Sequence, residues 1–263
     1  MPAVGTEKTA PIVTLALDTS SRASSIAVAS GDQIVKFVIN DADGGRSERL
    51  WGEIESVLDE TGLTLGDVSL YAVCTGPGGF TGIRVGVAAV KGLAMATRSR
   101  VVGVTALEAL AYGARPGEIV CSLIRGHHGD VYSQVFTIED DGAPAVLLPP
   151  IVSPLADAIN RVTDRDAVLF VGEHATMNAE AIGQAAGRRY READSLRLKG
   201  WRVKPEPGAL AEGIARLAFL RHLRGETGWA ESLAACYVRP AEAEIKLGLG
   251  LVGSKINRML KTK

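Results

Sequence analysis

Residues 75–95 read TGPGGFTGIRVGVAAVKGLAM, a glycine-rich turn that leads into a helix with apolar side chains on nearly every side. Arg84 and Lys91 are the charged residues of this stretch. A helix that is apolar all round must be covered all round, and a sheet covers only one face of it. We therefore expect the helix at 83–97 to pack on a sheet with one face and on another helix with the opposite face.

Small residues recur along this helix at four-residue spacing, which lets a second helix approach closely. They are Gly82 and Gly86, followed by Ala88, Gly92 and Ala96. Two covers fit this pattern: the chain's own helix at 47–61, or a helix of a second protein.

The segments around this stretch alternate between strand and helix patterns. Short apolar runs bounded by turn residues predict strands, and apolar residues at 3.6-residue spacing predict helices. Strand, turn, helix and strand in succession imply a parallel crossover. The elements expected in this part are strands at 12–18, 24–30, 33–40, 70–75 and 101–104, with helices at 47–61 and 83–97.

A fainter version of the same order follows residues 111–117. Its expected elements are strands at 119–124, 131–139 and 167–171, with helices at 154–162 and 208–224. We therefore expect an α/β chain of two halves, each a mixed sheet with helices on both faces. The first domain would cover residues 12–111 and the second 112–240, followed by a basic tail at 241–263.

The composition is that of a folded protein without a global attraction to nucleic acid. The chain has 263 residues, of which 46% are hydrophobic and 22% charged, enough to bury a core. With 29 basic and 30 acidic residues, its formal net charge is −1. Any RNA contact would have to be local.

The N-terminal residues lack the apolar core of a signal peptide, and no run of about 20 apolar residues suggests a membrane span. We therefore expect a cytoplasmic protein with no membrane contact. Cys74, Cys121 and Cys236 are far apart and form no C-x-x-C pair. This spacing predicts thiols that act as small buried hydrophobic groups, without a disulfide or a zinc site.

Four short motifs resemble the successive signatures of the TsaB (YeaZ) family. They are Asp18-Thr19-Ser20 after the first strand, SERL at 47–50, GPGGFTGIRVG at 76–86 and ACYVR at 235–239. The string at 76–86 is highly specific, and the similarity covers about residues 12–240. The resemblance implies a two-domain actin/Hsp70-like ATPase (ASKHA) fold.

The resemblance also implies a function. It suggests a chain that is inactive alone and serves as a scaffold or dimerisation subunit of the complex that places threonylcarbamoyl on a tRNA adenosine (t6A). Its partners would be the catalytic subunit TsaD and the ATPase TsaE. tRNA would be reached through the complex, a homodimer is the other assembly to consider, and no cofactor is expected. The residues assigned to a partner interface on the first two helices are Leu50, Trp51, Ile54, Ile83, Gly86, Val87, Ala89 and Val90.

The catalytic relative carries an H-x-x-x-H pair just after the strand that follows this helix. Two histidines one helical turn apart can hold one metal ion. The matching positions here are Ala106 and Leu110, which cannot ligate a metal. We therefore expect no catalytic residue and no metal site, which also argues against an M22-type metallopeptidase.

Asp18, Thr19 and Ser20 are the candidates for a cofactor site. A carboxylate and hydroxyl groups at a strand end suit the phosphate and metal of an actin-like ATPase. The alternative, which we favour, is a turn in which they bond nearby backbone N–H groups. An actin-fold ATPase or small-molecule kinase that uses Asp18 and the glycine turn is the rival function, although the turn lacks the Gly-Lys-Ser/Thr of a Walker loop.

Three other features resemble functional sites. The string GLGLVG at 248–253 matches a dinucleotide-binding motif, but only ten residues follow it. His127 and His128 are adjacent, and we expect them in a hairpin turn rather than at a metal. The basic residues near the end could hold RNA phosphate or stay solvated; they are Lys246, Lys255, Arg258, Lys261 and Lys263.

Overall fold

The computed structural model describes residues 11–40, 46–192, 200–204, 208–236 and 238. Two five-stranded mixed sheets form the framework of this part of the chain. The GLGLVG string and the basic tail lie outside the described residues.

The first sheet has the strand order β3-β2-β1-β4-β5. Its antiparallel part is β1, β2 and β3, and its parallel part is β1, β4 and β5. The strands are β1 (Val13–Asp18), β2 (Ser24–Ser30), β3 (Gln33–Asn40), β4 (Leu70–Cys74) and β5 (Arg100–Val104).

The second sheet has the order β10-β9-β6-β7-β8. β6, β7 and β8 are antiparallel neighbours, whereas β9 runs parallel to β6. The strands are β6 (Ile119–Arg125), β7 (Asp130–Ile138), β8 (Pro144–Pro154), β9 (Leu169–Val171) and β10 (Arg202–Val203).

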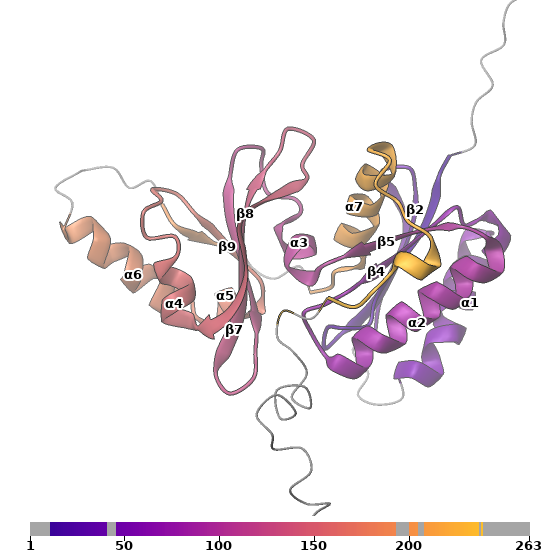
Figure 1. Cartoon of the computed structure of the whole chain (residues 1–263), viewed down its shortest axis with the longest axis horizontal. Coiled ribbons are helices and arrows are strands. Elements are labelled where there is room, and N and C mark those ends of the chain that lie inside the picture. The colour runs from indigo at the N-terminus through magenta and orange to yellow at the C-terminus, as the bar shows by residue number, and fades with distance from the viewer. Residues whose placement is uncertain (1–10, 41–45, 193–199, 205–207, 237, 239–263) are drawn as a thin grey trace, which may run out of the picture.

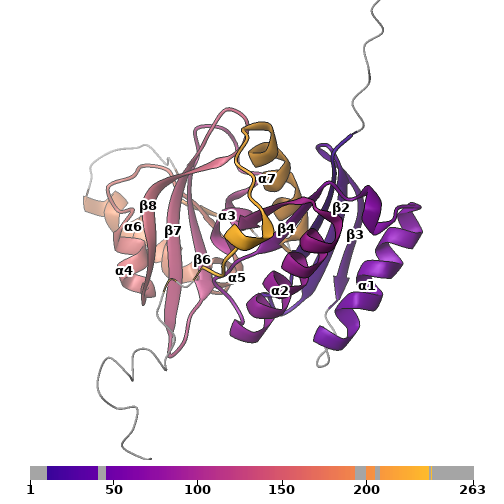
Figure 2. The same cartoon turned by 45° about the vertical axis from the view of Figure 1, so that its right-hand side comes forward.

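The helices and the two sheets form alternating layers (Figure 1). α1 and α2 cover the outer face of the first sheet, α3 and α7 lie between the sheets, and α4, α5 and α6 cover the outer face of the second. Figure 2 shows the same order from a second direction. The helices are α1 (Arg46–Thr61), α2 (Phe80–Thr97), α3 (Ala106–Ala111), α4 (Leu155–Asn160), α5 (Glu173–Met177), α6 (Ala179–Glu192) and α7 (Ala211–Leu223), with short 3-10 helices η1 (Leu65–Asp67) and η2 (Ala230–Ser232). The expected α/β fold, with helices on both faces of each sheet, is confirmed.

Alternation along β1 shows how the sequence produces these layers. Leu15 and Leu17 face the core under α1 and α2, while Ala16 faces the core that contains α3 and α7. All three side chains are fully buried. Because both faces of the strand are covered, the middle of β1 is continuously apolar from Leu15 to Leu17.

The segment that contains α7 was expected in the second domain at 112–240, but it lies on the first sheet. α7 packs on β1, β2, β4 and β5 of the first sheet. The chain then stays there, since Gly228 pairs with Val101 of β5 and Cys236 N–H donates to the carbonyl of Thr75. The spacing of apolar residues at 208–224 predicted a helix, but it carried no information about which sheet the helix covers.

Within the described residues, α2 is the helix whose length and apolarity would allow it to cross a membrane. It instead packs on β4 and β1, with Ile83, Val90 and Leu93 buried. The buried part of its apolar surface therefore belongs to the core of this fold.

Candidate functional site

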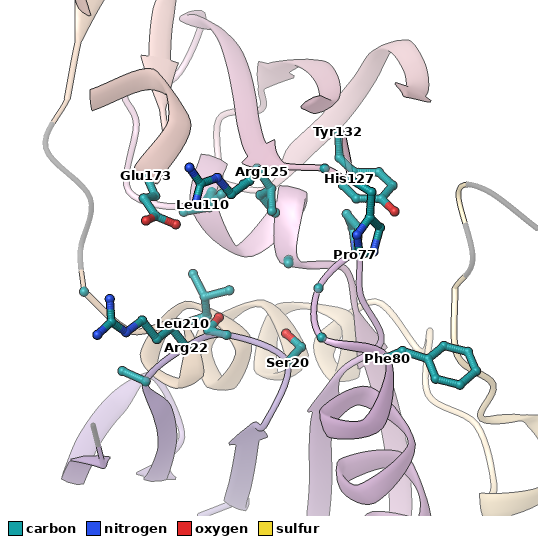
Figure 3. Close-up of a pocket in the computed structure, with 18 residues that line it drawn as sticks. Ser20, Arg22, Pro77, Phe80, Leu110, Arg125, His127, Tyr132, Glu173 and Leu210 are labelled. Atoms are coloured by element: carbon teal, nitrogen blue, oxygen red, sulfur yellow. The ribbon is translucent and has the colours of Figure 1, made fainter. Parts of the chain in front are cut away.

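A cavity of about 660 Å³ lies between the two halves of the molecule (Figure 3). One wall comes from the first sheet and the start of α2, and the other comes from α3, the β6–β7 hairpin and α5. Residues from both walls that line it include Ser20, Arg22, Gly79, Leu110, Arg125, His127 and Glu173.

The turn after β1 is held by hydrogen bonds between its own residues. The Oδ1 atom of Asp18 accepts hydrogen bonds from Ser20 N–H (2.8 Å), from the Ser20 hydroxyl (2.7 Å) and from Ser21 N–H (3.4 Å). Asp18 is fully buried and does not line the cavity, and its Oδ2 atom has no hydrogen-bond partner among the described residues. The Oδ1 atom of this carboxylate therefore has the turn geometry that we favour for Asp18.

This turn is also tied to the glycine-rich segment. Gly79 N–H donates to the carbonyl of Ser20 (2.8 Å), and the Thr19 hydroxyl donates to the carbonyl of Gly82 (2.7 Å). A Cβ on Gly78 would lie 2.7 Å from the Ser20 carbonyl oxygen, so glycine is needed for the close approach. The first wall of the cavity and the start of α2 thus form one packed unit.

The two positions that correspond to the histidine pair of the catalytic relative lie on the cavity. Ala106 and Leu110 both line it, and both are nearly fully buried. Thr105 caps their helix, because its hydroxyl accepts from Glu108 N–H while the Glu108 carboxylate accepts from Thr105 N–H. The described residues hold no cluster of three potential metal ligands.

His127 and His128 lie in the turn between β6 and β7, as expected. Gly126 N–H donates to the carbonyl of Asp130, which closes the hairpin. His128 has a φ of 56°, a left-handed turn conformation. Only His127 lines the cavity, so the two rings do not act together on it.

Burial makes two of the three cysteines poor nucleophiles. It raises the pKa of the Cys121 thiol to about 12, and it raises that of Cys74 together with the nearby Asp18 carboxylate. Cys236 is only partly buried. The thiols at 74 and 121 are therefore buried as the sequence predicts, and the Cys74 sulfur also accepts a hydrogen bond from the Ser20 hydroxyl (3.1 Å).

Most of the residues that the sequence assigned to a partner interface are buried in the core of this chain, so they are not available to a partner. Gly86 packs against Thr19 and Val73, and Ala89 lies in the core under α1 and α2. Of the assigned set, Trp51 is half exposed and Val87 is partly buried. Those buried in the chain's own core are Leu50, Ile54, Ile83, Gly86, Ala89 and Val90. Apolarity alone did not distinguish core positions from a partner surface.

The exposed face of α2 carries a different row of small residues. Ala88, Gly92 and Ala96 are exposed at four-residue spacing, and Met95 beside them is 65% exposed. A Cβ on Gly92 would meet nothing within 4 Å. The small residues that recur at four-residue spacing therefore form two rows. Gly82 and Gly86 pack against the turn after β1, whereas Ala88, Gly92 and Ala96 face outward.

An arginine stacks on an aromatic ring at each end of this face. The Arg84 guanidinium lies 3.8 Å from the centroid of the Phe80 ring, and that of Arg100 lies 3.9 Å from the Trp229 ring. Trp229 is 50% exposed and precedes η2, which packs against α2. No periodic pattern points to Trp229, because this residue comes beside α2 only through the return of the chain after α7.

The sequence of this chain is similar to those of known proteins that act in the threonylcarbamoylation of tRNA. A protein-family profile described as TsaD, tRNA N6-adenosine threonylcarbamoyltransferase, matches residues 40–166. The tRNA threonylcarbamoyladenosine biosynthesis protein TsaB of Bacillus subtilis is 28% identical over 239 residues, which is 88% of this chain and 96% of that protein. TsaB of Escherichia coli is 30% identical over 147 residues, 52% of this chain and 63% of that protein.

Solved structures give the same result for the whole fold. A Pseudomonas aeruginosa protein described as similar to peptidase YEAZ superposes with a TM-score of 0.67 at 25% identity, covering 87% of this chain and 100% of that one. YeaZ from the same organism superposes with a TM-score of 0.63 at 25% identity, covering 86% and 99%.

Proposed function

Because this chain belongs to the TsaB (YeaZ) family, we propose that it is a non-catalytic scaffold subunit of the complex that makes threonylcarbamoyladenosine in tRNA. Its partners are a TsaD-like catalytic subunit and a TsaE-like ATPase, and it contacts tRNA through that complex in the cytoplasm. The proposal is supported by the similarity to TsaB over nearly the whole chain. It is also supported by apolar side chains at Ala106 and Leu110, where a metal-binding relative would need ligands.

The observation that carries the scaffold role is the exposed face of α2. Small residues at Ala88 and Gly92 permit a partner helix to approach closely, and Met95 offers an adaptable apolar contact. Tryptophan and arginine, which often dominate binding energy, flank this face as Trp229 and Arg100. A TsaD-like subunit would bury the α2 face together with Trp51 of α1.

Co-purification with the TsaD-like subunit of the same organism tests this proposal. Gly92→Leu fills the open position on α2, and Met95→Glu places a charge in the contact, so both should abolish co-elution. Met177→Glu is the matched control, because Met177 is 58% exposed on α5 of the other half. It should bind as wild type does.

Each variant must still melt cooperatively, so that loss of binding is not confused with damage to the core. Gly86→Leu and Ala89→Glu are unsuitable here, because both residues are buried in the chain's own core. Folded Gly92→Leu and Met95→Glu proteins that bind the partner as tightly as wild type would contradict the proposed docking face.

A further inference from the structure

The exposed face of α2 carries positive charge and no carboxylate. Lys91, Met95 and Arg98 follow one another at i, i+4 and i+7, so they lie on one side of the helix. Arg98 is exposed and Lys91 is partly exposed. The sequence contains no Asp or Glu from Val68 to Leu107, so the charged side chains of α2 and β5 are all cations.

Arg100 adds a third cation, whose guanidinium is held in place by an aromatic ring. It lies 3.9 Å from the centroid of the Trp229 ring, and Trp229 is 50% exposed. The segment that carries Trp229 runs beside α2 (Figure 2). A guanidinium that stacks through its flat face keeps its N–H donors at the edge, where a carboxylate can accept two hydrogen bonds.

The carboxylates nearest to this face form no ion pair with its three cations. α2 contacts η1 and η2, which carry Asp67 and Glu231, and it contacts α1, where Glu55 and Asp59 are exposed. Asp67 instead accepts hydrogen bonds from Thr64 (2.7 and 2.8 Å). Within the part of the chain that the structure describes, the ion pairs all join other residues.

This positive charge is a local property of the face, since the formal net charge of the whole chain is −1. The dipole of α2 accounts for a cation at Arg98, which follows the last residue of the helix. It does not account for Lys91, which lies about two turns earlier. The fold therefore leaves the three cations to be neutralised by solvent or by a partner.

We propose that the surface which docks on the exposed face of α2 presents carboxylates to Lys91, Arg98 and Arg100, around an apolar centre that covers Gly92 and Met95. This inference rests on the proposed function, because it gives the chemistry of the contact surface on the TsaD-like subunit. Opposite charges on the two surfaces steer the encounter and raise the association rate. A second copy of this chain that docked through its own α2 would bring like charges together, so the face favours a different chain over a copy of itself.

Stopped-flow measurement of association between the purified chain and the TsaD-like subunit tests this inference. A double variant with Lys91→Gln and Arg98→Gln removes two charges, and one with Lys91→Glu and Arg98→Glu reverses them. At low salt the association rate should fall by about 10-fold in the first variant and by more in the second, with a smaller change in the dissociation rate. At about 1 M salt both rates should approach that of wild type, because screening is then nearly complete.

Arg115→Glu is the matched control, at an exposed arginine between α3 and β6. It changes the net charge as Lys91→Glu does, and it should leave the association rate unchanged at either salt concentration. Circular dichroism and cooperative melting of each variant show that the fold is intact.

The inference is overturned if wild type binds the subunit at a rate that does not depend on salt, or if the reversed-charge variant associates as fast as wild type at low salt. Those results leave the proposed function standing, whereas a wild-type chain that binds the subunit at neither salt concentration contradicts both. Sedimentation velocity and tRNA titration of the chain alone measure the other occupants. A homodimer or a tRNA complex that the reversed charges abolish would assign the cations to a second copy or to RNA phosphate instead.

Discussion

The Thr19 hydroxyl donates a 2.7 Å hydrogen bond to the carbonyl oxygen of Gly82, which joins the turn after β1 to the first turn of α2. Glycine permits this contact, because a Cβ at position 82 would overlap the Thr19 carbonyl oxygen. A Cβ on Gly86 would likewise overlap the Thr19 hydroxyl. The wall of the cavity and the proposed docking helix are consequently held together by one packed contact.

Two glycines of α2 should respond in opposite ways to the same substitution. Gly82→Ala places a methyl group against the backbone of Thr19 and should lower the unfolding free energy by about 1–3 kcal/mol. Gly92→Ala meets open space and should raise it by up to about 1 kcal/mol, because alanine favours the helix. Urea denaturation of both variants measures the difference. Equal effects at the two positions would show that the contact with Thr19 does not restrict α2.

Substitution of Asp18 should lower the stability of the fold, with little effect on tRNA modification by the complex. Asp18→Ala removes the acceptor for Ser20 N–H and the Ser20 hydroxyl and should cost about 1–3 kcal/mol, whereas Asp18→Asn keeps an acceptor oxygen. We expect tRNA modification by a complex reconstituted with either variant to stay within about tenfold of wild type, as a turn role requires. A larger loss of activity in a folded, assembled Asp18→Asn complex would instead support a direct role for this carboxylate at a cofactor.

The contribution of the Arg224 ion pairs to the stability of the fold should depend on pH. Arg224 bonds Glu139 at 2.6 Å and Asp141 at 2.5 Å, which connects the end of α7 to the β7–β8 turn. The Ala143 N–H and then Arg224 hold the pKa of Asp141 below its usual range. Stability from this lowered pKa is present above the unfolded value of about 3.9 and is lost as the pH falls through the folded value.

Arg224→Gln should therefore lower the unfolding free energy at pH 7 by about 0.2–1 kcal/mol, the range for exposed pairs. The difference from wild type should shrink as the pH falls below about 4, when Asp141 becomes protonated. Urea titrations between pH 7 and pH 3 measure this change, with Arg115→Gln as the reference. A difference that stays constant down to pH 3 would show that the carboxylate of Asp141 is not involved.

The chain alone should neither hydrolyse ATP nor modify tRNA. Ala106 and Leu110 provide no metal ligands at the cavity, and the Asp18 carboxylate is engaged in its own turn. Reconstitution with and without the TsaD-like subunit, followed by mass spectrometry of the tRNA nucleosides, measures this. Modified adenosine formed without that subunit would refute the scaffold proposal.

Sequence alone was sufficient for the strands of the first sheet, for its two outer helices and for the family resemblance, but it did not predict β8, β10, α3, α5 or α6. Short apolar runs predicted the strands of the first sheet within about one or two residues, and the glycine-rich turn at 76–79 appeared directly before α2 as expected. The strands and this turn depend on residues that are neighbours along the chain, so they can be predicted from local periodicity and turn-forming residues. The string at 76–86 identified the family for the same reason, because it lies within one continuous segment.

Tertiary structure alone decided which apolar positions are core and which are surface. Ala88 and Ala89 are adjacent alanines of α2, yet Ala88 is exposed and Ala89 is buried beneath α1. The same holds for α7, whose pattern does not say that it returns to the first sheet, and for Trp229, which the chain brings beside α2. The physical reason is that burial and sheet assignment depend on contacts between residues far apart in the chain, and an apolar side chain has the same sequence signal whichever surface covers it.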